Sequence, residues 1–202
     1  SVTEAAEPAS SVTDGLAFGA TAAYAAPKQA STTAHSVSAA LKKQGLSEVH
    51  IHQWGQEHPG SSLSKFGSMT PERQRKIAGV ASFIRKTNKS ISQKTAWREA
   101  SALVYYSAKY GVPADLAVSI AKLESRFNPS AASRSGAVGV MQVLWRVHSG
   151  MLRSKGIAEE RNHMFDPERG IEAGVLILSR YVKFYGSLQK AIARYYGGAA
   201  HA

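Results

Sequence analysis

The sequence predicts a mostly α-helical protein, and three observations support this prediction. From Thr70 onward, apolar residues recur every three to four positions, the period of a helix that buries one face. Residues suited to helix starts and ends, such as Thr70-Pro71 and Gly111, separate these periodic stretches. We find no internal repeat and at most one short hairpin. The fold class is therefore mostly α.

Several of the expected helices have a start or stop signal of their own. Pro113 begins the third helix, and Asp166 caps the fifth, with Pro167 at its first position. Because Asp-Pro at a helix start is typical of capping, we interpret Asp166 as a structural residue. We expect helices to run from Thr70, from Ser92 to Lys109, from Pro113 to just before Asn128, from Met141 to Arg153, from Asp166 to Tyr185, and from Ser187 to Tyr196.

The N-terminal third of the chain has no such periodicity. Residues 1–40 are rich in Ala, Ser and Thr, which is typical of a tail or linker. Residues 41–68 are ambiguous, because Val49 and Ile51 alternate with histidines and hint at a short strand, whereas Leu41, Trp54 and Phe66 could pack on a core. We therefore divide the chain into a flexible or loosely structured extension, residues 1–68, and a helical domain, residues 69–202.

Composition excludes several classes of function. The chain has no Cys, so it has neither a disulfide framework nor a thiolate nucleophile. It has no run of 18 apolar residues and hence no expected transmembrane helix. The histidines at positions 50, 52 and 58 lack the clustered acids of a metal site, and we expect them to be solvated. No metal or cofactor is expected.

Charge is distributed unevenly along the chain. Residues 1–65 hold four lysines and five acids, a net charge of −1, whereas residues 66–202 hold 21 Lys and Arg against nine acids, a net charge of +12. A basic helical domain favours a polyanionic partner: nucleic acid, anionic lipid or an acidic polymer. A generic basic surface would give the same charge, so this observation alone selects none of them.

Glu124 lies where an acid is not expected. In a helix from Pro113, it falls on the same face as Ala117, Ile120 and Ala121, near the C-terminal end. Both burial and the negative end of the helix dipole disfavour the carboxylate, so they raise its pKa. A carboxylic acid that stays protonated near neutral pH is suited to general acid catalysis. An ion pair with Arg126 or Lys122, or a kinked helix end, would instead make Glu124 structural.

A glycine-flanked loop follows this helix. Gly136 and Gly139 enclose two residues, and Met141-Gln142 come directly after them. Glycine allows a close approach of the backbone to a ligand. Gln142 has an amide that could hydrogen-bond a polar substrate.

These motifs resemble those of the soluble lytic transglycosylases, which share a lysozyme-like fold with goose-type lysozymes. The resemblance rests on four segments that occur in the same order as in that family: Glu124-Ser125-Arg126-Phe127-Asn128-Pro129; Ser133 with Gly136-Ala137, Gly139 and Met141-Gln142; Phe165-Asp166-Pro167 through Gly174; and Ala191-Ile192-Ala193-Arg194-Tyr195-Tyr196-Gly197-Gly198. The last resembles the family's Ala-x-x-Ala-Tyr-Asn-x-Gly segment. Gly170 and Tyr196 stand where the family has Asn, and residues 143–148 also depart from its pattern.

The resemblance implies a specific reaction and site. Glu124 would protonate the glycosidic oxygen between N-acetylmuramic acid and N-acetylglucosamine and then, as a base, deprotonate the muramoyl 6-hydroxyl, which closes a 1,6-anhydro ring. Neither water nor a second carboxylate is needed. Substrate-binding residues carried over by motif position are Ser125, Ser133, Gly139, Met141, Gln142, Tyr195 and Tyr196.

The alternatives are a muramidase that hydrolyses the same bond, a wall-binding protein that has lost activity, of which Tyr196 would be the sign, and a basic nucleic-acid-binding module. The ordered motifs favour peptidoglycan glycan strands over nucleic acid as the partner. A wall-spanning secretion, conjugation or phage apparatus is a further partner class. We expect export to the periplasm or cell envelope, with a signal peptide removed before Ser1, or else a location in a phage particle or lysate.

Overall fold

A computed structural model describes residues 37–200 of the chain, so the expectations for residues 1–36 lie outside the described part. The described chain is mostly α-helical, as predicted. Its elements are α1 (Val37–Lys42), α2 (Glu48–Glu57), the 3-10 helix η1 (Ser62–Ser68), α3 (Pro71–Thr87), α4 (Gln93–Tyr110), α5 (Ala114–Ser125), β1 (Ala137–Val138), β2 (Val143–Leu144), α6 (Trp145–Ser154), the 3-10 helix η2 (Arg161–Phe165), α7 (Pro167–Tyr185) and α8 (Leu188–Ala200).

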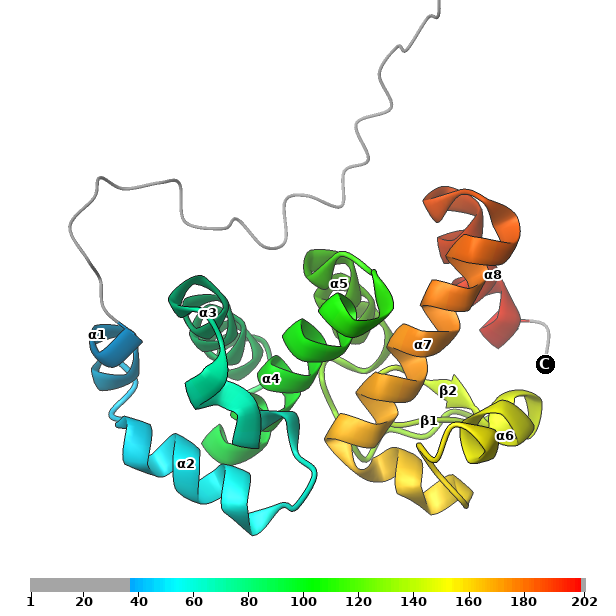
Figure 1. Ribbon diagram of the computed structural model, residues 1–202. Coiled ribbons are helices and arrows are strands. Elements are labelled where there is room, and N and C mark those ends of the chain that lie inside the picture. The colour runs from blue at the N-terminus through cyan, green and yellow to red at the C-terminus, as the bar shows by residue number, and fades with distance from the viewer. Residues whose placement is uncertain (1–36, 201–202) are drawn as a thin grey trace, which may run out of the picture.

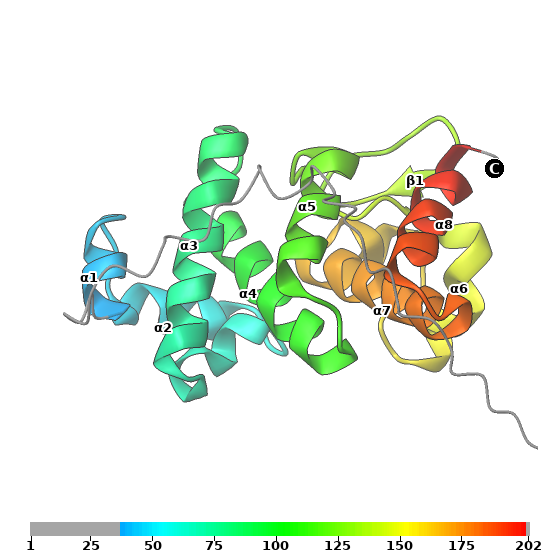
Figure 2. The same cartoon turned by 90° about the horizontal axis from the view of Figure 1, so that it is seen from above.

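The elements are arranged from one end of the molecule to the other. Figure 1 and Figure 2 show α1, α2 and α3 at one end, α4 and α5 in the middle, and the β-hairpin, α6, α7 and α8 at the other end. One continuous set of buried apolar side chains runs from Leu41 in α1 to Tyr195 in α8. Within residues 37–200, no helix combines the length and the apolar character needed to cross a membrane.

Helix starts after residue 69 follow the signals in the sequence. The Thr70 hydroxyl accepts a hydrogen bond from the Arg73 N–H, and the Ser92 hydroxyl accepts one from the Thr95 N–H. Gly111 ends α4 in the left-handed conformation, with φ 69°. The helix expected from Met141 is wrong in its first turn, because Gln142 has φ 50° and residues 143–144 pair with β1, so α6 begins only at Trp145.

The strand expected around Val49 is wrong. Residues 48–57 form α2, in which Ile51 is buried and Val49 is 73% exposed. Ser47 and His50 cap the start of this helix. The Ser47 N–H donates a hydrogen bond to His50 Nδ1 at 3.1 Å, and the Ser47 hydroxyl lies 2.9 Å from the same atom. Alternation over four residues was too short a pattern to outweigh this cap.

Loose structure is also the wrong expectation for residues 37–68. Leu41, Leu63 and Phe66 are buried in the common core, and residues 37–40, which we assigned to the tail, form the first turn of α1. Gln44 joins this segment to the rest: its Nε2 donates to the Ala78 carbonyl at 3.0 Å, and its Oε1 accepts from Trp97 Nε1 at 3.2 Å. Among residues 37–68, the extension is therefore an ordered helical layer. The domain boundary at residue 68 stays a prediction.

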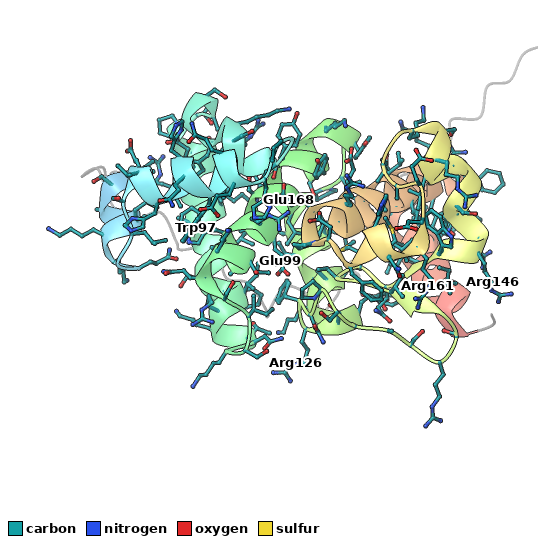
Figure 3. The ribbon with its side chains drawn as sticks, turned by 90° about the horizontal axis from the view of Figure 1, so that it is seen from below. Trp97, Glu99, Arg126, Arg146, Arg161 and Glu168 are labelled. Atoms are coloured by element: carbon teal, nitrogen blue, oxygen red, sulfur yellow. The ribbon has the colours of Figure 1, made fainter. Side chains whose placement is uncertain are left out.

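A buried ionic network fastens this layer to α7, and we call it the Glu168 network. The Glu168 carboxylate accepts hydrogen bonds from the Ser62 N–H at 2.7 Å, from the Ser62 hydroxyl at 2.9 Å and from the Ser61 hydroxyl. Arg98 of α4 donates from Nε to Glu168 at 2.9 Å and from Nη2 to Asp166 at 2.8 Å. Glu168 lies in the interior of the molecule (Figure 3). Three segments far apart in the sequence thus meet at one carboxylate.

Glu99 is a second acid in the interior, and it has no such network. Its side chain is fully buried, and neither carboxylate oxygen accepts a hydrogen bond from any residue between 37 and 200. Burial raises the pKa of Glu99 well above its ordinary value, and Arg98 opposes this only in part. Folding therefore shifts the Glu99 carboxyl group toward its protonated form.

We expect Glu99→Gln to stabilise the protein as pH rises. Because the pKa of Glu99 is higher in the folded than in the unfolded protein, ionisation of Glu99 opposes folding. The contribution of its protonated form to stability is fully present below the unfolded pKa of about 4.3 and is lost as pH rises through the folded pKa. Gln is neutral at every pH, so the difference in melting temperature between variant and wild type should widen from pH 4 to pH 8. Thermal unfolding at several pH values measures it, with Glu159→Gln at an exposed position as control. A difference that stays constant with pH would contradict the interpretation.

Candidate active site

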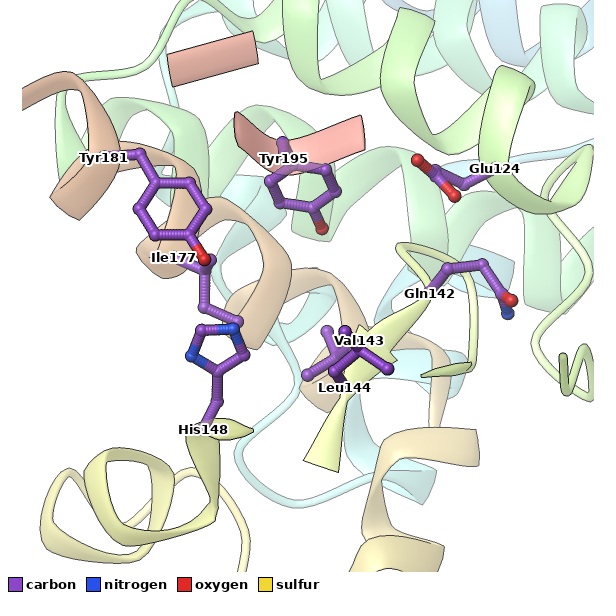
Figure 4. Close-up of a pocket in the computed structure, with 8 residues that line it drawn as sticks. All are labelled: Glu124, Gln142, Val143, Leu144, His148, Ile177, Tyr181 and Tyr195. Atoms are coloured by element: carbon purple, nitrogen blue, oxygen red, sulfur yellow. The ribbon is translucent and has the colours of Figure 1, made fainter. Parts of the chain in front are cut away.

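A pocket opens at the end of the molecule that contains the hairpin. Glu124 of α5 and Gln142 form one side of it, His148 of α6 and Tyr181 of α7 form the other, and Tyr195 of α8 lies between them (Figure 4). Val143, Leu144 and Ile177 complete the lining. Each of these residues comes after position 123, so the helical layer of residues 37–68 supplies none of them.

Glu124 reaches the pocket because α5 ends immediately after it. Arg126 and Phe127 both have positive φ, 52° and 63°, which turns the chain away from the helix axis. Phe127 is fully buried, which holds this turn against the core. Ala117, Ile120 and Ala121 are buried on the same helix face, as the periodicity predicted. The turn leaves the Glu124 side chain half-buried at the rim of the core.

Burial raises the pKa of the Glu124 carboxyl, and no charged neighbour contributes to the shift. The ion pair with Arg126 or Lys122 that would have made Glu124 structural is absent among residues 37–200, since Arg126 donates instead to the Thr87 carbonyl at 2.9 Å. The Glu124 carboxylate receives no hydrogen bond from this part of the chain. It is therefore free to exchange a proton with a ligand.

Two hydrogen bonds hold the glycine loop against the helices on either side of it. The Ser125 hydroxyl donates to the Val140 carbonyl at 2.8 Å, and the Tyr195 hydroxyl donates to the Met141 carbonyl at 2.8 Å. Met141 itself is fully buried. The structure thus brings Ser125, Met141 and Tyr195 together around Glu124, with both hydroxyl protons directed to backbone carbonyls.

Gln142 and Gly139 shape the loop itself. Gln142 Nε2 donates to the Gly139 carbonyl at 3.0 Å and to the Ala131 carbonyl at 3.3 Å, while its backbone has φ 50°. Gly139 has φ 77°, and a Cβ there would lie 2.2 Å from the Met164 carbonyl oxygen. Glycine is required at this position by the close approach of η2. The motif residues therefore build a rigid wall beside Glu124.

Of the expected site residues, only Glu124, Gln142 and Tyr195 line the pocket. Ser125, Gly139 and Met141 hold the loop in the contacts described above, and Ser133 and Tyr196 do neither. Ser133 is exposed, and its hydroxyl accepts from the Ala137 N–H at 3.0 Å, which stabilises the turn before β1. Tyr196 packs edge-on against Tyr195, with ring centroids 6.5 Å apart. Burial raises the pKa of Tyr196, and the charge of Glu124 adds to the shift. Tyr196 is therefore near Glu124 without lining the pocket.

Sequence analysis missed His148 and Tyr181 as pocket residues. Their rings lie 6.3 Å apart, and the Tyr181 ring lies 6.5 Å from that of Tyr195. His148 falls within residues 143–148, where the chain departs from the family pattern, and that departure was the only signal that this wall of the groove differs. Tyr181 falls on a regular helical face, where an aromatic residue is usually core.

Glu124 is the only acid among the residues that line the pocket. Asp166 caps α7 as predicted, accepting from the Arg169 N–H at 3.0 Å. Burial raises the pKa of Asp166, but hydrogen bonds from the Arg169 backbone and from Arg98 outweigh it and lower the pKa overall. In residues 37–200, no three His, Asp or Glu side chains lie close enough together to share a metal ion. His50 Nδ1 instead accepts a hydrogen bond from the Ser47 N–H.

Gly174 of α7 sets the spacing between Met141 and Tyr195. A Cβ at this position would lie 2.4 Å from Met141 Cβ and 2.9 Å from the Tyr195 hydroxyl oxygen. We expect Gly174→Ala to cost about 1–3 kcal/mol of stability through overpacking and to reduce activity further, because the Tyr195 hydroxyl loses the Met141 carbonyl.

Melting temperature and activity, measured well below the melting temperature of the variant, separate these two effects of Gly174→Ala. The matched control is Gly150→Ala in α6, where a Cβ would meet open space. This control should be neutral or stabilise by about 0.5–1 kcal/mol. Equal behaviour of the two variants would contradict the expected role of Gly174.

Comparisons with known proteins identify the family of the part of the chain that contains this pocket. The family model described as "Transglycosylase SLT domain" matches residues 101–202, half of the chain. The chain is 40% identical over 94 residues to proteins named "Membrane-bound lytic murein transglycosylase C" from Yersinia pestis (strain Pestoides F) and from Yersinia pseudotuberculosis serotype O:1b (strain IP 31758). Each alignment covers 45% of this chain and 26% of the relative, so the chain spans about a quarter of the length of the curated relatives it matches.

No solved structure matches the chain significantly. The family match nevertheless covers every residue of the pocket, from Glu124 to Tyr195. It also confirms the expected SLT-type, lysozyme-like helical domain. The chain therefore belongs to the transglycosylase SLT-domain family.

Proposed function

We propose that this protein is a peptidoglycan lytic transglycosylase and that Glu124 is its single acid–base residue. The observation that carries the proposal is a half-buried carboxyl group, with a pKa raised by burial, that lines a pocket containing no other acid. Family membership and the printed name of the relatives, which denotes a murein transglycosylase, support the same reaction.

The proposed reaction begins with Glu124 protonated. Its proton passes to the glycosidic oxygen as the bond from that oxygen to the muramoyl anomeric carbon breaks. The Glu124 carboxylate then takes the proton of the muramoyl 6-hydroxyl, whose oxygen attacks the anomeric carbon and closes the 1,6-anhydro ring. The proton returns to Glu124, and no water is consumed. The rigid loop held by Ser125 and Tyr195 would keep the acid in place for both steps.

The single carboxyl group favours this reaction over hydrolysis. Retaining and inverting glycosidases use a pair of carboxyl groups about 5–10 Å apart. Asp166, the other acid of the shared motifs, is bound to Arg98 and caps α7. These hydrogen bonds give Asp166 a structural role, so the pocket lining offers no second carboxyl group to activate a water molecule.

The proposed substrate is the glycan strand of peptidoglycan, and the proposed location is the cell envelope. Residues 66–202 have a net charge of +12, which would attract the anionic wall polymer. The relatives are named as membrane-bound, which supports an envelope location for this protein also. A secretion, conjugation or phage apparatus as a further partner stays a prediction from the sequence.

Product analysis tests the proposal. Purified protein is incubated with isolated sacculi, and the soluble fragments are analysed by mass spectrometry. Anhydromuramoyl ends are expected. Reducing muramic acid ends, which carry one additional water, would identify a hydrolase instead. The absence of both would indicate a wall-binding protein without activity.

The activity should fall as pH rises through the pKa of Glu124. The reaction starts from the protonated acid, and burial extends that form to higher pH than in an exposed glutamate. We expect kcat/KM to be constant at low pH and to fall about tenfold per pH unit above the pKa. Rates on soluble glycan from pH 4 to pH 8 measure this profile, with circular dichroism at each pH as the folding control. A midpoint at or below about 4.3, the ordinary value for Glu, would contradict the assignment.

A further inference from the structure

The polar side chains that line the pocket differ in whether they already have a partner within the protein. Tyr195 donates its hydroxyl proton to a backbone carbonyl of the glycine loop. Gln142 donates from its amide nitrogen to two backbone carbonyls, and Figure 4 shows this amide group pointing away from the pocket. Besides the acid Glu124, the polar residues that remain in the lining are His148 of α6 and Tyr181 of α7.

His148 and Tyr181 present free hydrogen-bonding groups to the pocket. In the described part of the chain, neither the imidazole nor the Tyr181 hydroxyl takes part in a hydrogen bond or an ion pair. Their rings lie 6.3 Å apart, and Figure 4 shows both across the pocket from Glu124. Burial lowers the pKa of His148, and neighbouring positive charges lower it further, so the imidazole is mostly neutral at pH 7. A neutral imidazole and a phenol can each donate one hydrogen bond and accept another.

The rest of the pocket lining is apolar. It consists of Val143, Leu144 and Ile177, whose side chains are largely buried, and it includes no Lys or Arg. A carboxylate bound at this wall would therefore have no cation in contact with it. A hydroxyl group alone would use the polar atoms of His148 and Tyr181 but not the apolar surface beside them. The wall best fits an uncharged group that donates and accepts hydrogen bonds and also carries a small apolar part.

We propose that His148 and Tyr181 bind the 2-acetamido group of a sugar residue in the glycan strand, beside the bond that Glu124 protonates. This inference rests on the proposed function, because it takes the glycan strand of peptidoglycan as the ligand. The amide N–H and C=O of the acetamido group meet the imidazole and the phenol, and its methyl group contacts Leu144 and Ile177. The pair therefore selects N-acetylated strands over sugar polymers that have a hydroxyl group at the same carbon.

The two residues are not supplied by the motifs that this chain shares with its family. His148 falls in residues 143–148, which depart from the family pattern, and Tyr181 lies between the third and fourth shared segments. The selectivity that they give is thus an addition to the acid of the shared motif, Glu124.

Binding measurements in the Glu124→Gln background test the proposal without turnover. The double variant His148→Ala/Tyr181→Phe removes the polar atoms of the pair but keeps the aromatic ring of α7. The matched control is Tyr185→Phe, which removes a hydroxyl group one turn further along α7. Tyr185 is outside the pocket lining, although its ring lies 6.2 Å from that of Tyr181.

The probes are two neutral β-1,4-linked sugar polymers of equal length. Chitooligosaccharides carry an acetamido group on every sugar residue, and cello-oligosaccharides carry a hydroxyl group at the same carbon. Ligand-observed NMR measures the affinity for each probe, and circular dichroism with melting temperature shows that each variant is folded. If the double variant does not fold, Tyr181→Phe alone, which removes a single hydroxyl group, is compared with Tyr185→Phe in the same way.

The Glu124→Gln parent should bind chitooligosaccharides about tenfold or more tighter than cello-oligosaccharides. The double variant should lose about tenfold in affinity for chitooligosaccharides, as expected when hydrogen bonds to an uncharged group are removed, and less than about twofold for cello-oligosaccharides. His148→Gln, which keeps a donor and an acceptor, should lose less than His148→Ala. The Tyr185→Phe control should match its parent on both probes.

Three results would overturn the proposal. The first is equal affinity of the parent for the two probes, and the second is an equal loss of affinity for both probes in the double variant. The third is unchanged affinity of the double variant for chitooligosaccharides, which decides the question even if cello-oligosaccharides bind too weakly to be measured.

The acetamido site and the proposed reaction can fail independently. If the wild-type protein releases anhydromuramoyl products but the double variant shows no selective loss of affinity, the site is refuted and the reaction stands. If the selective loss appears but the wild-type protein releases no anhydromuramoyl product, the reaction is refuted and the site stands.

Discussion

Glu124→Gln is expected to abolish glycan cleavage while leaving the fold intact. Gln is nearly isosteric with Glu, but it can neither donate the proton to the glycosidic oxygen nor accept one from the 6-hydroxyl. General acid–base catalysis is worth about 10²–10⁴ in rate, and both steps depend on this one group. We therefore expect kcat to fall by about 10³ or more, measured as anhydromuramoyl product released from sacculi.

Stability provides the control for this variant. Because burial raises the folded-state pKa of Glu124, the ionised carboxylate opposes folding at pH values above that pKa. Glu124→Gln should thus melt at the same temperature as wild type at pH 4 and at the same or a higher temperature at pH 7. The matched variant Glu159→Gln, at an exposed position, should retain full activity. Near wild-type turnover in Glu124→Gln would assign the acid to another residue.

Glu168→Ala should be the most destabilising of the single substitutions considered for this protein. It removes the acceptor of Ser61, Ser62 and Arg98 at once and leaves the largely buried Arg98 side chain with Asp166 alone. Breaking a buried ion pair by removing one partner costs about 3–5 kcal/mol. For a chain of this length we expect the melting temperature to fall by on the order of 10 °C, measured by calorimetry.

A double-mutant cycle shows whether the loss arises in the Glu168 network. Ser62→Ala removes the hydroxyl that donates to Glu168 at 2.9 Å and lies 3.0 Å from that of Ser101. Its effect on the free energy of unfolding should be much smaller in the Glu168→Ala background than in wild type. Glu72→Ala controls for charge and helix propensity, because Glu72 is also an acid in the first turn of an α-helix but is exposed. Additive effects of Ser62→Ala and Glu168→Ala would show that the network does not couple the two segments.

Sequence reasoning located the helices of residues 70–196 because their boundaries depend on local chemistry. Thr70 and Asp166 cap the helices that they were expected to cap, Ser92 caps the helix that was expected to begin there, and Gly111 ends α4. The helical turn expected at Met141 was wrong because Gln142 has a left-handed backbone conformation. That conformation accompanies hydrogen bonds from the Gln142 side chain to the Gly139 and Ala131 carbonyls, which the periodicity of apolar residues cannot predict.

Motifs and the apolar face of one helix predicted part of the site, and the rest depends on packing between helices. Glu124, Gln142 and Tyr195 lie together, and the burial of the α5 face follows the predicted stripe. His148 and Tyr181 belong to the pocket through packing between α6 and α7, and their spacing of 33 positions carries no signal. Glu168 resembles any acid in the first turn of a helix, so its partners in residues 61–62 could not be inferred.

The Glu168 network joins parts of the chain that are made at very different times. Ser61 and Glu168 are 107 positions apart, so their contact forms only after a long loop closes. While the chain is being made or threaded through a membrane channel from its N-terminus, α1, α2 and η1 emerge long before their acceptor does. The segment of η1 therefore lacks its hydrogen bonds to Glu168 until the first turn of α7 has been made. A chain that has not yet reached Glu168 lacks this network, so its N-terminal helices are easier to unfold.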